Sequence, residues 1–199
     1  MRGGVGGPGD GESPPPHNLP RVDSSVTEFA FASHVPVGER RFRERSGLDF
    51  EEFEIGQVFK HRPGLTISQQ DNAEEALDTL NQAMLHYDTS YAARTEWGKN
   101  LVVSTLTIQR CIGMTSKTFG KRVRVVGFTD IALTRPVFGG DTLYAETEVL
   151  ATRDDGHPSW GRLGLSTQGV NQRGEVVCTL RWEIDVYKRA GLPFAEAGY

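Results

Sequence analysis

The segment LNQAMLHYD, residues 80–88, holds one histidine with polar side chains at helical spacing around it. His86 could act as a base, because a neutral imidazole near pH 7 can accept a proton from water and return one. Asn81 can position water through hydrogen bonds, but an amide cannot ionise and so cannot be the base. From spacing alone, a catalytic histidine and a histidine that merely ends a helix are equally good interpretations.

Two acids near this histidine each have a catalytic and a structural interpretation. Asp88 would share a side with His86 if the segment is extended, but we favour a simpler role as the N-cap of a helix that begins at residue 89. Asp78 lies one turn before Asn81 on a predicted helix and could face the same pocket. A solvated acid on an amphipathic helix is the commoner case, so neither acid is assigned to catalysis.

The elements that must position these side chains follow from hydrophobic periodicity. Apolar residues around a turn at Gly56 in the segment 50–64, and the alternating LTIS at 65–68, predict strand structure. A helix with acids in its first turn follows at 71–84, and then a short helix at 88–98. An extended LVV then leads into a helix whose apolar positions predict that it is largely buried. Those positions are Val103, Leu106, Cys111 and Met114.

From Gly120 onwards the pattern is typical of strands, in three runs at 123–137, 141–155 and 160–189. FGGD at 138–141 and NQRG at 171–174 resemble hairpin connections, so three or four long antiparallel strands are expected. One or two strands, then helices, then an antiparallel meander predict an α+β domain in which the sheet wraps one buried helix.

The first 47 residues differ from the rest of the chain. Six of the ten prolines and a glycine-rich opening lie there, a composition that offers little apolar surface to offset the entropy of ordering. We expect residues 1–47 to be a disordered extension, 48–190 to be the single domain, and 191–199 to be a tail. The chain's 199 residues suffice for one core of ordinary size.

Composition excludes several classes of protein. A net charge of −4 provides no basic stripe for a nucleic-acid surface, so no nucleic-acid partner is expected. No apolar run of about 18 residues could span a bilayer, and the opening lacks the apolar stretch of a secretory signal. Cys111 and Cys178 lack metal or disulfide-framework spacing, which indicates free thiols and a cytoplasmic protein.

Three segments carry a resemblance to a known family: LNQAMLHYDTSYAARTEWG at 80–98, NLVVSTLTI at 100–108, and LTRPVFGGDTLYAETEVL at 133–150, with NQRGEVV following. From about Phe50 to Arg189 the chain resembles the MaoC-like hydratases of the hotdog fold. The sequence of these segments most resembles that of the branch that acts on branched dicarboxylic acyl-CoA esters, the mesaconyl-CoA (β-methylmalyl-CoA) hydratases. The resemblance implies a homodimer, no metal, no bound redox cofactor, and reversible addition of water to an enoyl thioester.

The resemblance also implies roles for individual residues. His86 matches the family's catalytic histidine, and Asn81 stands where the common pattern has aspartate. Ser104 matches the glycine at the start of the central helix, where free N–H groups favour a developing anion, and Val103 and Thr105 flank it. The hydroxyl of Ser104 could equally be an ordinary N-cap. Ala83 and Met84 replace a polar residue and a proline of the family pattern.

Gln109 and Arg110 are unusual in the middle of a helix that is predicted to be buried. A buried guanidinium needs a partner, and a carboxylate suits it. Arg110 could therefore recognise a second carboxylate on the acyl group, or it could be an arginine that reaches solvent at the edge of the sheet or dimer.

Other functions on the same fold stay open. A thioesterase would direct water to the carbonyl instead of the β-carbon. A non-catalytic acyl-thioester-binding subunit would bind without turnover, and a dehydratase could act on a carrier-protein thioester in place of CoA.

Overall fold

The computed structural model describes residues 33–191. The greater part of the expected N-terminal extension, up to residue 32, and the tail from residue 192 lie outside the described residues. Within the described range, strands start earlier than the sequence predicts. β1 (His34–Gly38) and β2 (Arg41–Glu44) form a separate antiparallel pair, which holds residues 34–44 in regular structure.

The centre of the domain is a five-stranded antiparallel sheet in the order β3-β5-β6-β7-β4. Four of its strands have twelve residues each, as the strand pattern after Gly120 predicts. In order across the sheet, the five strands are β3 (Val58–Thr66), β5 (Thr142–Arg153), β6 (Trp160–Asn171), β7 (Val176–Tyr187) and β4 (Arg122–Leu133). The NQRG turn joins β6 to β7 as a hairpin, as expected.

The FGGD turn is not a hairpin, and this prediction was wrong. β4 pairs with β7 at one edge, whereas β5 lies between β3 and β6. The turn instead packs against the start of α1 (Gln69–Asp78): the Gly140 amide donates to the Ile67 carbonyl at 2.8 Å, and a Cβ on Gly139 would lie 3.1 Å from Gln69. The local sequence predicts a turn there, but it does not predict which strands pair with each other in the sheet.

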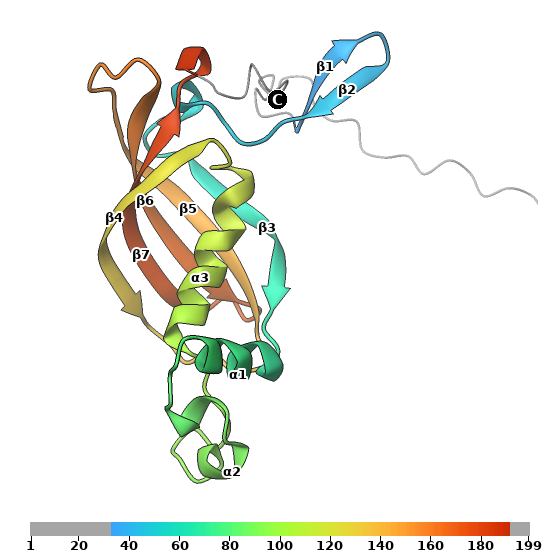
Figure 1. Cartoon of the computed structure of the whole chain (residues 1–199), viewed down its shortest axis with the longest axis vertical. Coiled ribbons are helices and arrows are strands. Elements are labelled where there is room, and N and C mark those ends of the chain that lie inside the picture. The colour runs from blue at the N-terminus through green and yellow to red at the C-terminus, as the bar shows by residue number, and fades with distance from the viewer. Residues whose placement is uncertain (1–32, 192–199) are drawn as a thin grey trace, which may run out of the picture. The chain divides into compact units, whose positions relative to one another are not determined.

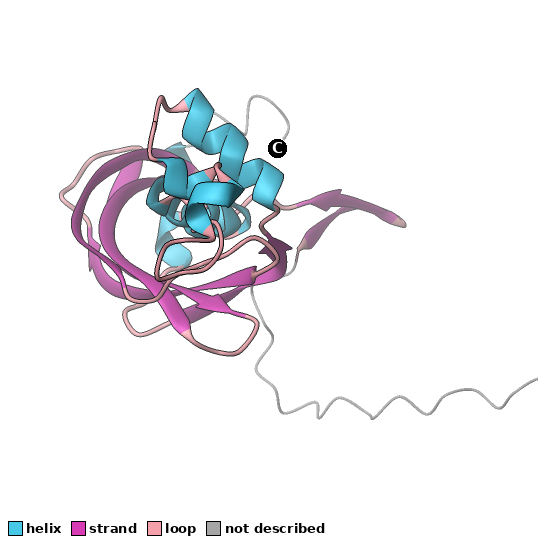
Figure 2. Cartoon of the chain, turned by 90° about the horizontal axis from the view of Figure 1, so that it is seen from below, coloured by secondary structure: helices cyan, strands magenta, loops and turns pink. Residues whose placement is uncertain are grey.

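Helix α3 (Ser104–Met114) lies along one face of the sheet. Figure 2 shows the sheet curving around the helices, and this is the expected hotdog arrangement of a sheet wrapped around a central helix. Only one face of α3 is buried, through Leu106, Thr107 and Cys111, and Gln109 is exposed. The expectation of a largely buried helix therefore holds for one face alone.

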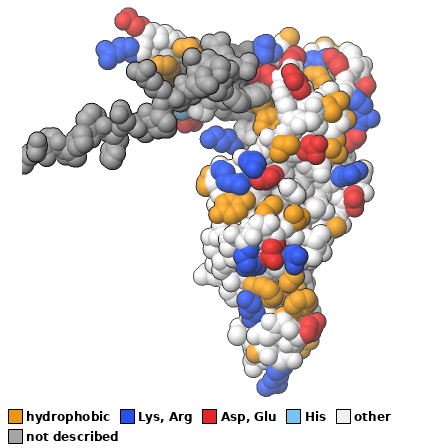
Figure 3. Space-filling model, turned by 180° about the vertical axis from the view of Figure 1, so that it is seen from behind, with side chains coloured by type: hydrophobic (Ala, Val, Ile, Leu, Met, Phe, Trp, Pro, Cys, Tyr) orange, Lys and Arg blue, Asp and Glu red, His pale blue; other side chains and the backbone are white. Residues whose placement is uncertain are grey.

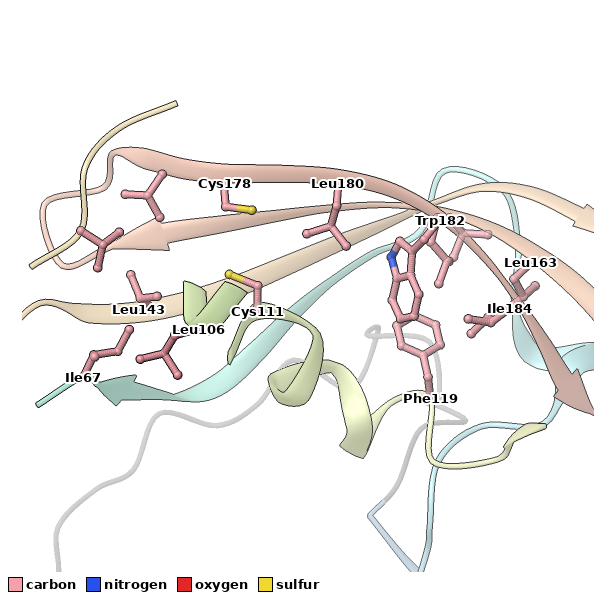
Figure 4. Packing of buried hydrophobic residues seen from close by; sticks show 14 of the residues in the cluster. Ile67, Leu106, Cys111, Phe119, Leu143, Leu163, Cys178, Leu180, Trp182 and Ile184 are labelled. Atoms are coloured by element: carbon pink, nitrogen blue, oxygen red, sulfur yellow. The ribbon is translucent and has the colours of Figure 1, made fainter. Parts of the chain in front are cut away.

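Apolar side chains from α3 and from the inner face of the sheet form the core. Alternate residues of β6 and β7 point inward, so that Leu163, Leu165, Leu180 and Ile184 are almost fully buried. Figure 4 shows Ile67, Leu106 and Leu143 together at one end, and Trp182 beside Phe119 at the other. Cys111 and Cys178 lie between these groups as buried free thiols.

Two helices before α3 are shorter than predicted. α1 (Gln69–Asp78) begins with a capping box of Ser68 and Asp71 and ends before Leu80, whose φ of 57° is left-handed. Asn81 therefore follows the helix and is not on it. α2 (Thr89–Ala92) has four residues in place of a helix over 88–98, because tight turns continue the chain to Gly98, where φ is 66°.

The face of the sheet away from α3 is polar and mixed in charge. Figure 3 shows acidic and basic side chains of both signs with scattered apolar side chains between them. Asp185 on this face is fully buried between Arg124 and Arg162, which approach its carboxylate to 2.7 and 2.9 Å. In the part of the chain that the structure describes, no helix is long and apolar enough to cross a membrane.

Candidate functional site

His86 ends a single 3₁₀ turn, η2 (Met84–His86), beside the segment that leads into α3. Its Nδ1 lies 2.8 Å from the carbonyl oxygen of Leu101, which can only accept, so Nδ1 carries the proton of the neutral ring. Nε2 then has a free lone pair, and no described residue bonds to it. The imidazole is half-buried and oriented, with one nitrogen open.

Two buried asparagines hold this turn in place. The Asn72 amide nitrogen donates to the His86 carbonyl at 2.9 Å, and the Asn100 amide nitrogen donates to the Leu85 carbonyl at 3.2 Å. Asn72 is fully buried and Asn100 is 6% exposed. Because a buried amide without partners is costly, these bonds fix where the backbone of the turn lies.

Asn72 also connects the turn to the start of α3. Its nitrogen donates to the Leu101 carbonyl at 2.9 Å, the same oxygen that accepts from His86, and its Oδ1 accepts from the Val103 amide at 2.8 Å. Sequence analysis did not identify Asn72 or Asn100. The available signal was Asn72 in register with Ala76 on the buried stripe of α1, since asparagine disfavours helix interiors.

The start of α3 presents free backbone donors. Val103 is the N-cap and Ser104 is the first helical residue, so the alternative that the Ser104 hydroxyl caps the helix is wrong. Among the described residues, nothing accepts a hydrogen bond from the Ser104 amide, whereas the Val103 amide is occupied by Asn72. Such free amides and the helix dipole favour negative charge.

A cavity of about 280 Å³ opens at this end of α3. Ser104 and Leu101 form part of its wall, together with the residues that follow β4, among them Thr134 and Arg135. His86 does not line the cavity itself, but its imidazole is bonded to Leu101, which does. The structure thus places His86 behind Leu101 in a wall that also contains Ser104, and their cooperation in catalysis stays a prediction.

The other predicted site residues lie in different places. Asn81 is half-buried after α1, and its Oδ1 accepts from the Ala83 amide at 3.1 Å, while its Nδ2 makes no bond to a described residue. Asp88 caps α2 by accepting from the Tyr91 amide at 2.9 Å, which confirms the structural interpretation. Asp78 is exposed at the end of α1.

The outer side of α3 is separate from this cavity. The Gln109 side chain donates to Glu75 of α1 at 2.7 Å, and the Thr105 hydroxyl lies 3.5 Å from the same carboxylate. Arg110 is half-buried and lines a second cavity, between α3 and β3. The structure therefore does not place Gln109 or Arg110 beside Ser104.

The model of the mesaconyl-CoA hydratase family matches residues 28–192. Mesaconyl-CoA hydratase of Cereibacter sphaeroides is 24% identical over 70% of this chain and 41% of its own length. β-Methylmalyl-CoA dehydratase of Chloroflexus aurantiacus is 22% identical over 68% of this chain and 38% of its own length. The chain thus spans about two fifths of these relatives.

A solved structure shows the same fold in a longer chain. A Mycobacterium tuberculosis protein with a double hotdog fold superposes with a TM-score of 0.65, at 22% identity, over 73% of this chain and 46% of its own length. One hotdog unit therefore corresponds to this chain, and the matched protein carries further sequence of about the same extent.

Proposed function

Because the chain belongs to the mesaconyl-CoA hydratase family, we propose that it adds water reversibly to an enoyl-CoA thioester, with His86 as the acid and base. The observation that carries the proposal is the open Nε2 of His86, on an imidazole that the Leu101 carbonyl orients. In the hydration direction, Nε2 takes a proton from water while the oxygen of that water bonds to the β-carbon. The electron pair of the double bond moves onto the thioester, and the imidazolium then returns a proton to the α-carbon.

The enolate oxygen needs donors, and the start of α3 supplies them. The Ser104 amide is free, and Thr105 follows it in the first turn, where amides have no partner within the helix. Val103 contributes differently: its amide is bound to Asn72, so it fixes the start of the helix and does not itself polarise the thioester. The free Nδ2 of Asn81 would donate to the attacking water.

The proposal extends to the acyl group and to the carrier. The family match favours a branched dicarboxylic acyl group, such as mesaconyl, on CoA. No metal and no resident cofactor takes part, as the resemblance implies.

A panel of mesaconyl, itaconyl and crotonyl esters of CoA, read by mass for a change of one water, tests this proposal. Release of free thiol without a hydrated product would indicate a thioesterase, and saturable binding without turnover would indicate a binding subunit.

The proposal includes a dimer, since one chain leaves the sheet and the site open. β4 is an edge strand of twelve residues. Its apolar side chains Val126, Phe128, Ile131 and Leu133 are 40–46% exposed. A long apolar edge is a ready surface for pairing with another strand. The cavity beside Ser104 is lined by Leu133 and the residues that follow it, so a second copy joined along β4 would close that cavity.

Sedimentation of an edge variant tests the dimer. We expect Ile131→Lys to sediment as a monomer, because a charge within the paired edge must be desolvated. Val58→Lys is the matched control, since Val58 is 56% exposed on β3 at the opposite edge. A dimer that survives Ile131→Lys, or a monomer with the unchanged chain, would contradict pairing along β4.

A further inference from the structure

The largest of the cavities described here lies between α3 and β3, and no function has been assigned to it. Its volume is about 390 Å³, within the range of small-molecule sites. It shares no lining residue with the cavity beside Ser104. Arg110 lies six residues after Ser104, or about 9 Å along a helix at 1.5 Å per residue, and the rest of the cavity extends further toward the end of α3.

Among residues 33–191, three cations and no acid line this cavity. Arg62 comes from β3, Arg110 from α3 and Lys117 from the 3₁₀ turn η3 (Thr115–Lys117). This grouping contrasts with a chain of net charge −4. Cations near the end of a helix are favoured by its dipole, but that effect alone does not require them to face one hollow.

The partners of these cations leave positive charge uncompensated. The Arg62 guanidinium is held by the His61 carbonyl at 2.8 Å, stacks over Tyr144, and lies 3.7 Å from Glu146. In the described part of the chain, Arg110 and Lys117 make no hydrogen bond and no ion pair. Asp71 interacts electrostatically with Arg110, but its carboxylate already accepts two hydrogen bonds from Ser68, which are the main cause of its lowered pKa.

A second observation concerns the shape of the cavity. Gly113 lies in α3, where glycine costs up to about 1 kcal/mol relative to alanine. A Cβ at this position would meet no atom within 4 Å, so packing does not require the glycine. The missing side chain keeps the hollow open between Leu65 and Met114, which give it apolar walls.

We propose that the cavity between α3 and β3 binds an organic phosphate, with its phosphate held by Arg110 and Lys117 and its apolar part against Leu65 and Met114. Arginine matches phosphate oxygens with two parallel hydrogen bonds, and lysine adds a point charge. This site goes beyond the proposed function and does not depend on hydration. The phosphate comes either from the carrier of the thioester or from a separate metabolite.

Calorimetry with pyrophosphate, 3′,5′-ADP and CoA tests the site without any turnover. We expect Arg110→Gln to weaken the binding of all three by at least about tenfold, as for the loss of a charged hydrogen bond. Arg181→Gln removes the same charge from an exposed position on β7 and should change binding by less than about twofold. Equal weakening by both variants, or no binding to the unchanged chain, would overturn the proposal.

A second variant distinguishes binding in this cavity from nonspecific electrostatic attraction of the ligand to positive charge. Gly113→Leu keeps every charge, favours helix and fills the hollow, so it should abolish the binding of 3′,5′-ADP and CoA. Unchanged affinity in this variant would also overturn the proposal.

Enzyme kinetics then identify the source of the phosphate. If Arg110→Gln raises KM for an enoyl-CoA but not for the matching enoyl-pantetheine, the phosphate belongs to the carrier. If it loses pyrophosphate binding with both KM values unchanged, the phosphate belongs to a separate metabolite.

Discussion

Two histidines near opposite ends of α3 have opposite environments. His61, close to Phe119 after the helix, is 4% exposed, and both ring nitrogens face hydroxyl groups, Thr147 at 2.9 Å and Thr118 at 3.3 Å. His86, beside the start of the helix, has one nitrogen bound and one open. A ring with both nitrogens occupied can contribute to packing but cannot take a proton from a substrate or water, whereas a ring held through one nitrogen can.

Burial sets the charge of His61 as well. Desolvation, reinforced by the charge of Arg62, lowers the pKa of His61 to about 4, so the ring is neutral at pH 7. A chain of hydroxyl contacts continues from Thr147 to Thr167, whose oxygen accepts from the Trp182 indole at 2.9 Å. His61 is thus part of a polar network inside the core, and of these two rings only His86 has a nitrogen without a described partner.

The largest effect is expected from His86→Ala. Removing the acid and base should lower kcat for enoyl-CoA hydration by about 10²- to 10⁴-fold, while folding is retained because the ring makes a single hydrogen bond. His157→Ala is the matched control, since that ring stacks on Trp160 on β6 and not at the site. Steady-state kinetics measure the effect, and full activity in both variants would contradict the role of His86 as acid and base.

The second-largest effect is expected from Asn72→Ala, which tests how the His86 imidazole is held in place. Asn72→Ala leaves the Val103 amide without a partner and removes one of the hydrogen bonds to each of the His86 and Leu101 carbonyls, so the free energy of unfolding should fall by about 3 kcal/mol. We also expect kcat to fall more than KM changes, because Asn72 positions His86 without reaching the substrate.

Asn171→Ala is the control for Asn72→Ala, because Asn171 is also buried but lies in the β6–β7 turn. It should lower stability and leave kcat unchanged. Equal kcat in the two variants would show that Asn72 has a structural role only.

The buried His61, with both ring nitrogens facing hydroxyl groups, predicts a pH dependence of stability. Between pH 6.5 and about 4, the unfolded chain binds a proton at His61 that the folded chain does not. The free energy of unfolding should therefore decrease by about 3 kcal/mol as the pH is lowered through this window. His61→Gln cannot titrate and should remove this part of the slope. Denaturant unfolding at several pH values measures it, with His157→Gln as the control. An unchanged slope in His61→Gln would show that the ring is not neutral in the fold.

The smallest effect is expected at Asn81. Asn81→Ala removes one donor to water and should lower kcat by about tenfold or less, and it should also loosen the turn at Ala83. Asn81→Asp keeps that acceptor, so melting temperature should be preserved, and the direction of its change in kcat reports whether the site prefers an amide or an acid. A loss in Asn81→Ala as large as that in His86→Ala would mean that Asn81 shares the central role.

Sequence predicts the regular parts of this molecule well. Alternation in β5, β6 and β7 and the apolar stripe Leu106–Cys111 of α3 are local patterns, and each forms the expected element. Strand order is not local, which is why FGGD was misread as a hairpin. The length of α1 is overestimated because the left-handed residue Leu80 follows its end without a glycine or proline to signal it. The length of α2 is overestimated because tight turns continue the chain after Ala92.

The site was only partly predictable for the same reason. His86 and Ser104 were found through resemblance, but the residues that hold them, Asn72 and Asn100, act through bonds to carbonyls 14 and 15 residues away. Every residue has a backbone carbonyl, so a hydrogen bond to a carbonyl does not require a particular residue type and produces no sequence motif. The position of Arg110 in a separate cavity likewise depends on β3, which a helical pattern does not reveal.

The most direct test of the account is hydration in water labelled with ¹⁸O. If the site beside His86 adds water to the double bond, mesaconyl-CoA incubated with the protein should gain one labelled oxygen on the acyl carbon chain, with the thioester intact. Label found in a free carboxylate together with released CoA thiol, or no label in any product, would contradict it.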